Sequence, residues 1–238
     1  MYKIVLIRHG ESEWNLQNRF TGWADADLTD NGKKQAKLAG TYLKKAGYTF
    51  DIAFTSLLKR AIKTLHLALE EMDLLWIPET KAWQLNERHY GALQGLNKTG
   101  TSQHYSAEQV LIWRRSFKTA PPSLDASDER NPATDVRYAS VDKQLLPLTE
   151  SLETMMHRVI PYWQNEIVPY ILQGRKVIIS AHGNTLRGLV KYLDKMDDEQ
   201  IESFEIPTGV PLIYELSDKL EPLKHNYLTA ASFTAPIV

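Results

Sequence analysis

The sequence predicts a three-layer α/β/α fold with a mostly parallel central sheet. Three short segments, at 2–7, 51–56 and 176–181, are predicted to be strands, the first and third of them buried apolar runs. Each is followed, directly or after a loop, by a longer segment in which apolar residues recur at helical spacing. Strands that alternate with helices in this way usually pair in parallel, with helices on both faces of the sheet.

The first two helices have recognisable ends and faces. Thr29 precedes the helical segment 30–47 as an N-cap, and Gly47 stands where a helix commonly ends. In the segment 57–72, apolar residues recur at positions 58, 61, 62, 65 and 69. This spacing predicts one apolar face that packs on the sheet.

The second half of the chain repeats the order of helix, strand and helix. The segment 149–174 is amphipathic, although Pro161 and Pro169 should kink or interrupt it. The strand at 176–181 leads into a helix at 185–194, whose leucines and valine recur at helical spacing. Two further segments, at 210–216 and 221–228, predict a final pair of strands, as a hairpin at a sheet edge.

The 238 residues are expected to form one domain with an irregular insertion. Between 88 and 147 turn and breaker residues prevail, apart from a helical pattern at 108–117. Such a stretch inside a compact domain is more often a functional cover than a linker, and a disordered surface excursion is the alternative. The small residues of 229–238 fit either a mobile lid or an unordered terminus.

Composition excludes several classes of function. The 28 basic and 29 acidic residues give a net charge of −1, which argues against nucleic-acid or membrane partners. The absence of cysteine excludes disulfides and thiolate chemistry. The first apolar run is too short for a signal peptide or a membrane span, so a cytoplasmic protein is expected. His66, His104, His157 and His225 have no partners at metal-ligand spacing, so no metal is expected.

Two of the predicted strands lead into the same dipeptide. The run 2–7 is followed by His9-Gly10 after one arginine, and the run 176–181 by His182-Gly183. In open α/β sheets, ligands bind outside the carboxyl ends of the strands. Two imidazoles at two such ends can face each other across one ligand, and each glycine allows close approach of the backbone. The pattern predicts a functional site.

Two arginines complete a phosphate-binding pattern. Arg8 precedes His9, and Arg60 stands near the start of the helix after the second strand. Their guanidinium groups can hold phosphate oxygens, and their charge keeps His9 neutral and nucleophilic. The expected product is a phosphohistidine, with His182, Arg8 and Arg60 stabilising the transferred group. Glu11, Glu13 and Glu87 are all candidates for the proton donor and acceptor.

The chain resembles a known family in several motifs. LIRHGESEWN, FTGWADADLTDNG, LNERHYGALQGLNK, WRRSF and SAHGNTLRGLVKYL follow one another as in the 2,3-bisphosphoglycerate-dependent phosphoglycerate mutases of the histidine phosphatase superfamily. RHG marks the superfamily, whereas ERHYGALQGLNK together with WRR is far more specific to the mutases. The resemblance runs from Tyr2 to Leu228 and implies a phosphoglycerate mutase-like fold.

The resemblance also implies an activity. It suggests interconversion of 2-phosphoglycerate and 3-phosphoglycerate in glycolysis and gluconeogenesis, through a phosphohistidine primed by 2,3-bisphosphoglycerate and without a metal. His9 becomes the nucleophile, Glu87 the proton donor and acceptor, and His182 the stabiliser of the transition state. Positions that match the phosphate and substrate pocket are Arg8, Ser12, Asn15, Thr21, Gly22, Arg60, Gly183 and Asn184. Positions that match further substrate contacts of the mutases are Arg88, His89, Tyr90, Lys98, Arg114 and Arg115. A homodimer or a dimer of dimers is implied.

Two other functions stay open. The nearest alternative is a small-molecule phosphatase of the same superfamily, against which Lys98, Arg114, Arg115 and the long insertion weigh. A hydrolase has less need of a second cationic cluster and of a cover that excludes water. The other alternative is a catalytically silent module that binds phosphoproteins or metabolites, and the presence of His9 and Glu87 argues against it.

Overall fold

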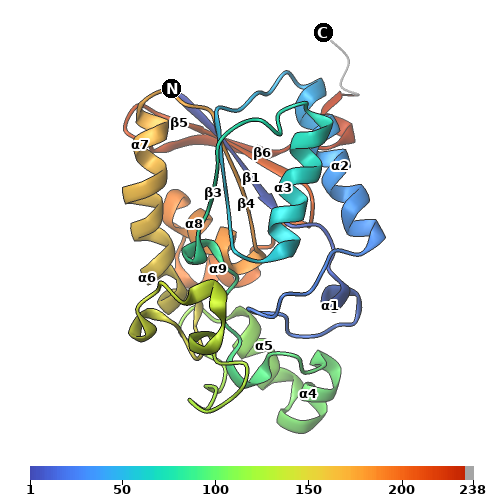
Figure 1. Ribbon diagram of the computed structural model, residues 1–238, viewed down its shortest axis with the longest axis vertical. Helices are drawn as coiled ribbons and strands as arrows, with labels where there is room; N and C mark the ends of the chain where they lie inside the picture. The colour runs from blue at the N-terminus through green and yellow to red at the C-terminus, as the bar shows by residue number, and fades with distance from the viewer. Residues whose placement is uncertain (234–238) are drawn as a thin grey trace.

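The computed structural model describes residues 1–233, and within them six strands form one sheet in the order β3-β2-β4-β1-β5-β6 (Figure 1). The strands are β1 (Tyr2–Arg8), β2 (Ile52–Thr55), β3 (Glu79–Lys81), β4 (Val177–Ala181), β5 (Pro211–Leu216) and β6 (Pro222–Tyr227). Strands β1 to β4 pair in parallel, whereas β5 and β6 are antiparallel to their neighbours. The predicted mostly parallel sheet and the final antiparallel pair are confirmed, and β3 is an additional edge strand.

Helices cover both faces of the sheet. They are α1 (Glu13–Leu16), α2 (Asp30–Lys45), α3 (Lys59–Glu71), α4 (Lys98–Tyr105), α5 (Ala107–Arg115), α6 (Leu152–Tyr162), α7 (Val168–Leu172), α8 (Gly183–Asp194) and α9 (Asp198–Ser203). In Figure 1, α2 and α3 lie on one side of the sheet, and α6 and α7 lie on the other. No helix among residues 1–233 combines the length and apolarity needed to cross a membrane.

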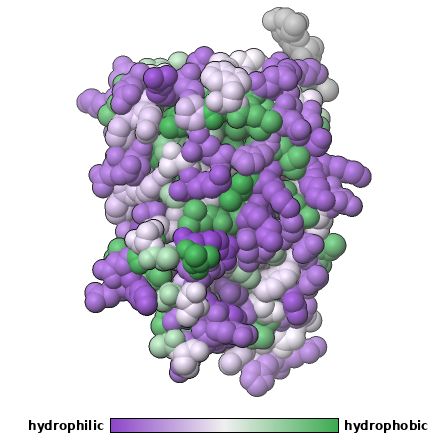
Figure 2. Space-filling model, viewed as in Figure 1, coloured by the Kyte–Doolittle hydropathy of each residue, from purple (hydrophilic) through white to green (hydrophobic). Residues whose placement is uncertain are grey.

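Alternation along β1 divides the core into two layers. Ile4 and Leu6 pack with buried residues of α7 and α8, whereas Val5 and Ile7 pack with buried residues of α2 and α3. Successive side chains of a strand point to opposite faces, so one short apolar run contributes to both layers. The face seen in Figure 2 is mainly hydrophilic, with smaller hydrophobic areas between the polar residues. The two core layers, one on each face of the sheet, confirm the predicted three-layer arrangement.

The predicted ends of α2 agree with the structure. The Thr29 hydroxyl accepts a hydrogen bond from the Gly32 amide at 3.0 Å, which satisfies one of the free donors of the first turn. Gly47, with φ +75°, follows the last helical turn in the left-handed conformation typical of a helix end. The N-terminus of α2 lies beside Glu11, whose carbonyl oxygen accepts from the Thr29 amide at 2.9 Å.

Pro161 and Pro169 differ in their effects. α6 continues through Pro161 for one further residue, and a π-helical turn at Trp163–Ile167 then separates it from α7. Pro169 follows this turn in the first residues of α7, where a missing amide donor costs least. The predicted interruption therefore lies between the two prolines. Trp163 and Ile167 stay buried, so the wide turn remains part of the core.

The insertion at 88–147 contains defined local structure. It includes α4, α5 and the 3₁₀ turns at 91–93, 132–134, 136–138 and 143–145. α5 corresponds to the helix predicted at 108–117, whereas α4 was not expected because its sequence is polar and lacks an apolar face. Side chains of Asn131, Asp135 and Asp142 each cap a following 3₁₀ turn.

The described part of the C-terminal tail lies along α2. Residues 229–233 include a 3₁₀ turn at Ala230–Phe233, and the Phe233 ring lies 5.6 Å from the Tyr42 ring. The Lys45 ammonium lies 4.5 Å from the centre of the Phe233 ring. Both partners belong to the end of α2 that is remote from Glu11, so residues 229–233 do not cover the carboxyl end of β1. The rest of the tail, 234–238, for which a lid and an unordered terminus were both expected, lies outside the described residues.

Gly10→Ala is expected to destabilise the fold by about 1–3 kcal/mol, the usual cost of forcing a methyl group into a packed site. A Cβ atom at position 10 would lie 2.2 Å from the carbonyl oxygen of Gly32, in the first turn of α2. Urea unfolding measures the loss. Gly100→Ala in α4 is the control, because a Cβ there meets nothing within 4 Å. Equal stability of the two variants would show that β1 and α2 can move apart freely.

Candidate active site

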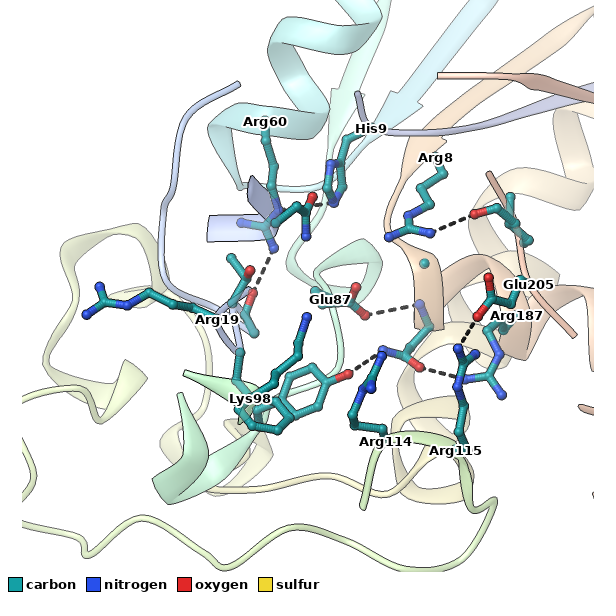
Figure 3. A pocket seen from close by; sticks show the side chains of 18 residues that line it. Arg8, His9, Arg19, Arg60, Glu87, Lys98, Arg114, Arg115, Arg187 and Glu205 are labelled. Atoms are coloured by element: carbon teal, nitrogen blue, oxygen red, sulfur yellow. Dashed lines mark hydrogen bonds and ion pairs between the residues drawn. The ribbon is translucent and has the colours of Figure 1, made fainter. Parts of the chain in front are cut away.

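A polar cavity of about 270 Å³ opens at the carboxyl ends of the parallel strands (Figure 3). It is lined by predicted site residues from five parts of the chain: Arg8, His9, Asn15, Thr21, Gly22, Arg60, Glu87, Tyr90, Lys98, Arg114, Arg115, Gly183 and Asn184. Its wall also contains Arg19, Phe20, Arg187, Glu205 and Ile206, which were not predicted from the sequence. The sheet, its adjoining helices and the insertion together bring most of the predicted residues to one place.

His9 is held in one orientation at the end of β1. Its Nδ1 lies 2.7 Å from the Gly10 carbonyl oxygen, which can only accept, so Nδ1 carries the proton. The Arg60 Nε donates to His9 Nε2 at 3.3 Å, which leaves Nε2 as the atom with the lone pair. Burial, together with the charges of Arg60 and Arg8, lowers the pKa of His9 well below its ordinary value. The imidazole is therefore neutral and can act as a nucleophile through Nε2.

His182 lies beside His9 but is not among the residues that line the cavity. The two ring centroids are 5.1 Å apart, and the planes meet at 61°. Burial and then Arg60 lower the pKa of His182 well below its ordinary value. The Ser56 hydroxyl lies 2.8 Å from Nε2 and accepts from the Leu58 amide, so its own proton can go to Nε2. Nδ1, which has no hydrogen-bond partner within residues 1–233, is then left with a proton for a ligand oxygen.

Arg60 is completely buried and fixed by backbone oxygens. Its two terminal nitrogens donate to the carbonyls of Ala24 and Gly22, each at 2.8 Å. Burial lowers the pKa of Arg60 to about 10, which still leaves the guanidinium charged at neutral pH. The group places a permanent positive charge beside His9.

Arg8 supplies a second cation next to the start of α8. One terminal nitrogen donates to the Ile206 carbonyl at 2.7 Å, and in the described part of the chain its buried Nε lacks a partner. A Cβ on Gly183 would come within 3.3 Å of that Nε, so glycine keeps the approach open. The first amides of α8 add the partial positive charge of a helix N-terminus.

Glu87 lies on the cavity wall, unlike the other two candidates for proton transfer. Its Oε1 accepts from the amides of Arg88 at 2.8 Å and Asn184 at 3.2 Å. Glu11 does not line the cavity, and its carboxylate accepts from the Thr29 hydroxyl at 2.7 Å. Glu13, in the first turn of α1, is exposed and also lies outside the cavity. The geometry favours Glu87.

A buried ion pair holds the segment that carries Glu87. Arg158 of α6 donates to both carboxylate oxygens of Glu150, at 2.7 and 2.8 Å. The same guanidinium donates to the carbonyls of Gln84 at 2.7 Å and of Glu87 at 3.0 Å. Because the rigid, planar guanidinium of Arg158 binds several backbone oxygens at once, the backbone from Gln84 to Glu87 has little conformational freedom. No pattern in the sequence predicts this ion pair.

Cations from the insertion form the other wall of the cavity, opposite His9 and Arg60 in Figure 3. Lys98 begins α4, and Arg114 and Arg115 end α5. Burial, assisted by Arg114 and Arg8, lowers the pKa of Lys98. Arg115 forms an ion pair with Glu205, which also lines the cavity. This wall can bind a second anionic group.

Besides His182, three predicted site residues do not line the cavity: Ser12, Arg88 and His89. Ser12 caps α1, where its hydroxyl accepts from the Asn15 amide at 3.2 Å. Arg88 is buried, donates to the Trp113 carbonyl at 2.8 Å and lies 4.5 Å from the centre of the Tyr90 ring. His89 is buried and accepts from the Gly91 amide at 3.0 Å. Ser12, Arg88 and His89 support neighbouring segments in this structure, and their predicted direct contacts with substrate stay predictions.

Of the lining residues that were not predicted, Arg187 could have been identified from helical periodicity. Arg187 lies three positions after Asn184 on α8, and residues three apart share a helix face. Arg19 and Glu205 come from irregular segments, where no period relates them to the site. Among residues 1–233, no group of three His, Asp or Glu is placed to hold a metal ion. The expectation of metal-free chemistry stays a prediction.

Acid is expected to destabilise the protein through His89. Burial lowers the pKa of His89 to about 4, so between pH 6.5 and 4 the unfolded state binds more protons. Stability then falls as pH falls, by about 3 kcal/mol over this window. His89→Gln should lose less stability on acidification, as measured by urea unfolding from pH 7 to 4. His157→Gln, at an exposed position of α6, is the control, and a parallel loss in all three proteins would contradict the assignment.

The comparisons with known proteins agree with this fold. The family model for the Histidine phosphatase superfamily (branch 1) matches residues 4–224. A mycobacterial glucosyl-3-phosphoglycerate phosphatase, solved with VO₃, is 20% identical over 96% of this chain and 98% of that chain, with a TM-score of 0.72. The alpha-ribazole phosphatase of Shigella flexneri is 22% identical over 93% of this chain and 94% of that chain, with a TM-score of 0.67.

Proposed function

Because the chain belongs to the histidine phosphatase superfamily (branch 1), we propose that it transfers phosphoryl groups through His9 and interconverts 2-phosphoglycerate and 3-phosphoglycerate. One observation carries the proposal: the cavity joins a phosphate site at His9 to a separate cationic wall at Lys98, Arg114 and Arg115. A phosphoglycerate carries two anionic groups, a phosphate and a carboxylate, and needs both parts.

The geometry supports a balanced transfer step. Nε2 of His9 attacks the phosphorus, an N–P bond forms, and the bond from phosphorus to the donor oxygen breaks. The departing oxygen takes a proton from the carboxyl group of Glu87, which becomes a carboxylate. His182, Arg8 and Arg60 face the phosphoryl oxygens throughout. In the second half, an acceptor hydroxyl returns its proton to Glu87 and attacks the phosphohistidine.

The proposal includes 2,3-bisphosphoglycerate as the primer. It gives one of its phosphates to His9 and leaves as a monophosphoglycerate. The phosphoenzyme then phosphorylates the free hydroxyl of an incoming phosphoglycerate, and the resulting bisphosphate returns its other phosphate to His9. Each bound species keeps a second anion at the wall formed by Lys98, Arg114 and Arg115. A cavity of about 270 Å³ suits a ligand of three carbons.

A small-molecule phosphatase is the second candidate. Both structural relatives described above are named as phosphatases, so the comparisons favour hydrolysis over isomerisation. One of those names contains a 3-phosphoglycerate unit, which fits a cavity with cations at both ends. In this case water takes the place of the acceptor hydroxyl and gives its proton to Glu87. The two candidates share the first half-reaction and differ in the acceptor.

A ³¹P NMR time course separates the candidates. The protein is incubated with 3-phosphoglycerate in EDTA, with and without a trace of 2,3-bisphosphoglycerate. Formation of 2-phosphoglycerate that needs the primer supports the mutase, and survival in EDTA supports metal-free chemistry. Release of inorganic phosphate without isomerisation supports the phosphatase. Failure to form any phosphoenzyme from labelled 2,3-bisphosphoglycerate would contradict both and favour a silent binding module.

As a mutase, the protein would serve glycolysis and gluconeogenesis in the cytoplasm. A homodimer or a dimer of dimers is part of the same proposal, and sedimentation equilibrium measures it.

A further inference from the structure

Arg187 is a buried cation of the cavity wall for which the proposed mechanism has no use. It belongs to α8, only 4% of it is exposed, and it lines the cavity. One terminal nitrogen donates to the Asn184 side-chain oxygen at 2.8 Å, and the other donates to the Ile201 carbonyl. Its Nε is buried and, within residues 1–233, has no hydrogen-bond partner. The guanidinium therefore has donor capacity left.

The charge of Arg187 is not matched by a carboxylate. Its two hydrogen-bond acceptors are a neutral amide and a peptide carbonyl, and it forms no ion pair within the described residues. Buried Arg158, by contrast, is paired with Glu150. Burial, together with Arg88 and Arg115, lowers the pKa of Arg187 to about 10, so the group stays charged at neutral pH. A buried, unmatched cation is unfavourable until an anion comes near it.

Arg187 lies at the end of the cavity remote from His9. Figure 3 shows it next to Arg115 and Glu205, whereas His9 and Arg60 lie on the opposite side. Arg115 is paired with Glu205, so part of its charge is already neutralised. Because the ion pair of Arg115 and Glu205 has no net charge, Arg187 provides positive charge at this end of the cavity.

We propose that Arg187 determines specificity by favouring ligands that carry a second anionic group, a carboxylate or a second phosphate, beyond the phosphate at His9. The inference rests on the proposed function, since it concerns the same cavity. The negative group is attracted by the unmatched charge of Arg187, and Arg115 contacts it together with the other cations of the insertion. A phosphoester without a second anion gains nothing from this charge.

Two ligands of the same skeleton test the inference. Glycerol 3-phosphate differs from 3-phosphoglycerate in having a hydroxymethyl group where the acid has a carboxylate. Isothermal titration calorimetry gives the Kd of each for the wild type and for Arg187→Met. The variant should bind 3-phosphoglycerate about tenfold or more weakly, the range for losing a charge-assisted contact. Its Kd for glycerol 3-phosphate should change less than about twofold.

Arg187→Lys keeps the test valid if the methionine variant does not fold. The ammonium preserves the charge and loses the fork that holds Asn184 and Ile201. A Kd for 3-phosphoglycerate close to the wild-type value in Arg187→Lys supports a role for charge, whereas weakening of both ligands by the same factor would assign Arg187 a merely structural role. Lys118→Met is the control for net charge, because Lys118 is exposed, pairs with Asp198 and lies outside the cavity. It should change neither Kd.

The wild-type titrations separate this inference from the proposed function. A wild type that binds the two ligands equally would overturn both, because the cavity would then have no second anion subsite. A wild type that prefers 3-phosphoglycerate, with the preference intact in Arg187→Met, overturns the inference alone. Preference in the wild type that is lost in Arg187→Met supports it.

Discussion

The His9→Gln variant is expected to form no phosphoenzyme and to lose on the order of 10⁵-fold or more in turnover, as when a covalent nucleophile is removed. Glutamine has no basic nitrogen to attack phosphorus. His182 cannot readily replace His9, since its Nε2 lies 2.8 Å from the Ser56 hydroxyl. The measurement is uptake of label from ³²P-labelled 2,3-bisphosphoglycerate into an acid-labile, alkali-stable form.

The matched control is His157→Gln, at an exposed position of α6. It should take up label at the wild-type rate. Label that persists in His9→Gln would show that another histidine is phosphorylated, and His182 would be the first to examine. Wild-type protein without label would instead argue against the whole phosphohistidine mechanism.

Glu87→Gln is expected to slow phosphoryl transfer by about 10²–10⁴-fold, the usual contribution of a general acid or base. Binding should be nearly unchanged, because the amide oxygen of glutamine can still accept from the amides of Arg88 and Asn184. The amide cannot give a proton to the departing oxygen. Rapid-quench measurement of His9 phosphorylation separates the transfer rate from binding.

A second substrate sharpens the assignment of Glu87. p-Nitrophenyl phosphate has a leaving group that needs little protonation, so the variant should lose much less activity with it. Glu13→Gln, outside the cavity, should behave as the wild type with both substrates. A wild-type rate of phosphoryl transfer in Glu87→Gln would mean that another carboxylate transfers the proton. Glu205 would then be the next candidate, because it also lines the cavity.

Local sequence was sufficient for the strands that carry the reacting groups. β1 and β4 each contain an uninterrupted apolar stretch, at 4–7 and 177–179, and buried parallel strands have this composition. The position of His9 and His182 follows from the rule that parallel strands present their carboxyl ends at one edge. β3 was not predicted because Glu79, Thr80 and Lys81 are polar, and only their pairing with β2 makes them a strand.

Residues whose role depends on distant partners could not be predicted. Nothing in the local sequence marks Arg158 and Glu150 as more than two charged residues. Arg158 matters for the site because it also donates to the backbone carbonyls of Gln84 and Glu87, some 70 residues earlier in the chain. Ser56 orients His182 across 126 positions of the chain. The contact between Phe233 and Tyr42 could not be predicted either, because the sequence around each residue gives no sign of the other. Such contacts are set by the tertiary fold.

The two ends of the cavity come from different parts of the fold. Arg8, Arg60 and Gly183 belong to the sheet and its adjoining helices, whereas Lys98, Arg114 and Arg115 belong to the insertion. A ligand with two anions spans the two parts and acts as a tether between them. A ligand with one anion occupies a single side and leaves the parts joined only by protein contacts. If the proposed function holds, a doubly charged substrate is therefore expected to hold the insertion more firmly against the sheet than a singly charged one does.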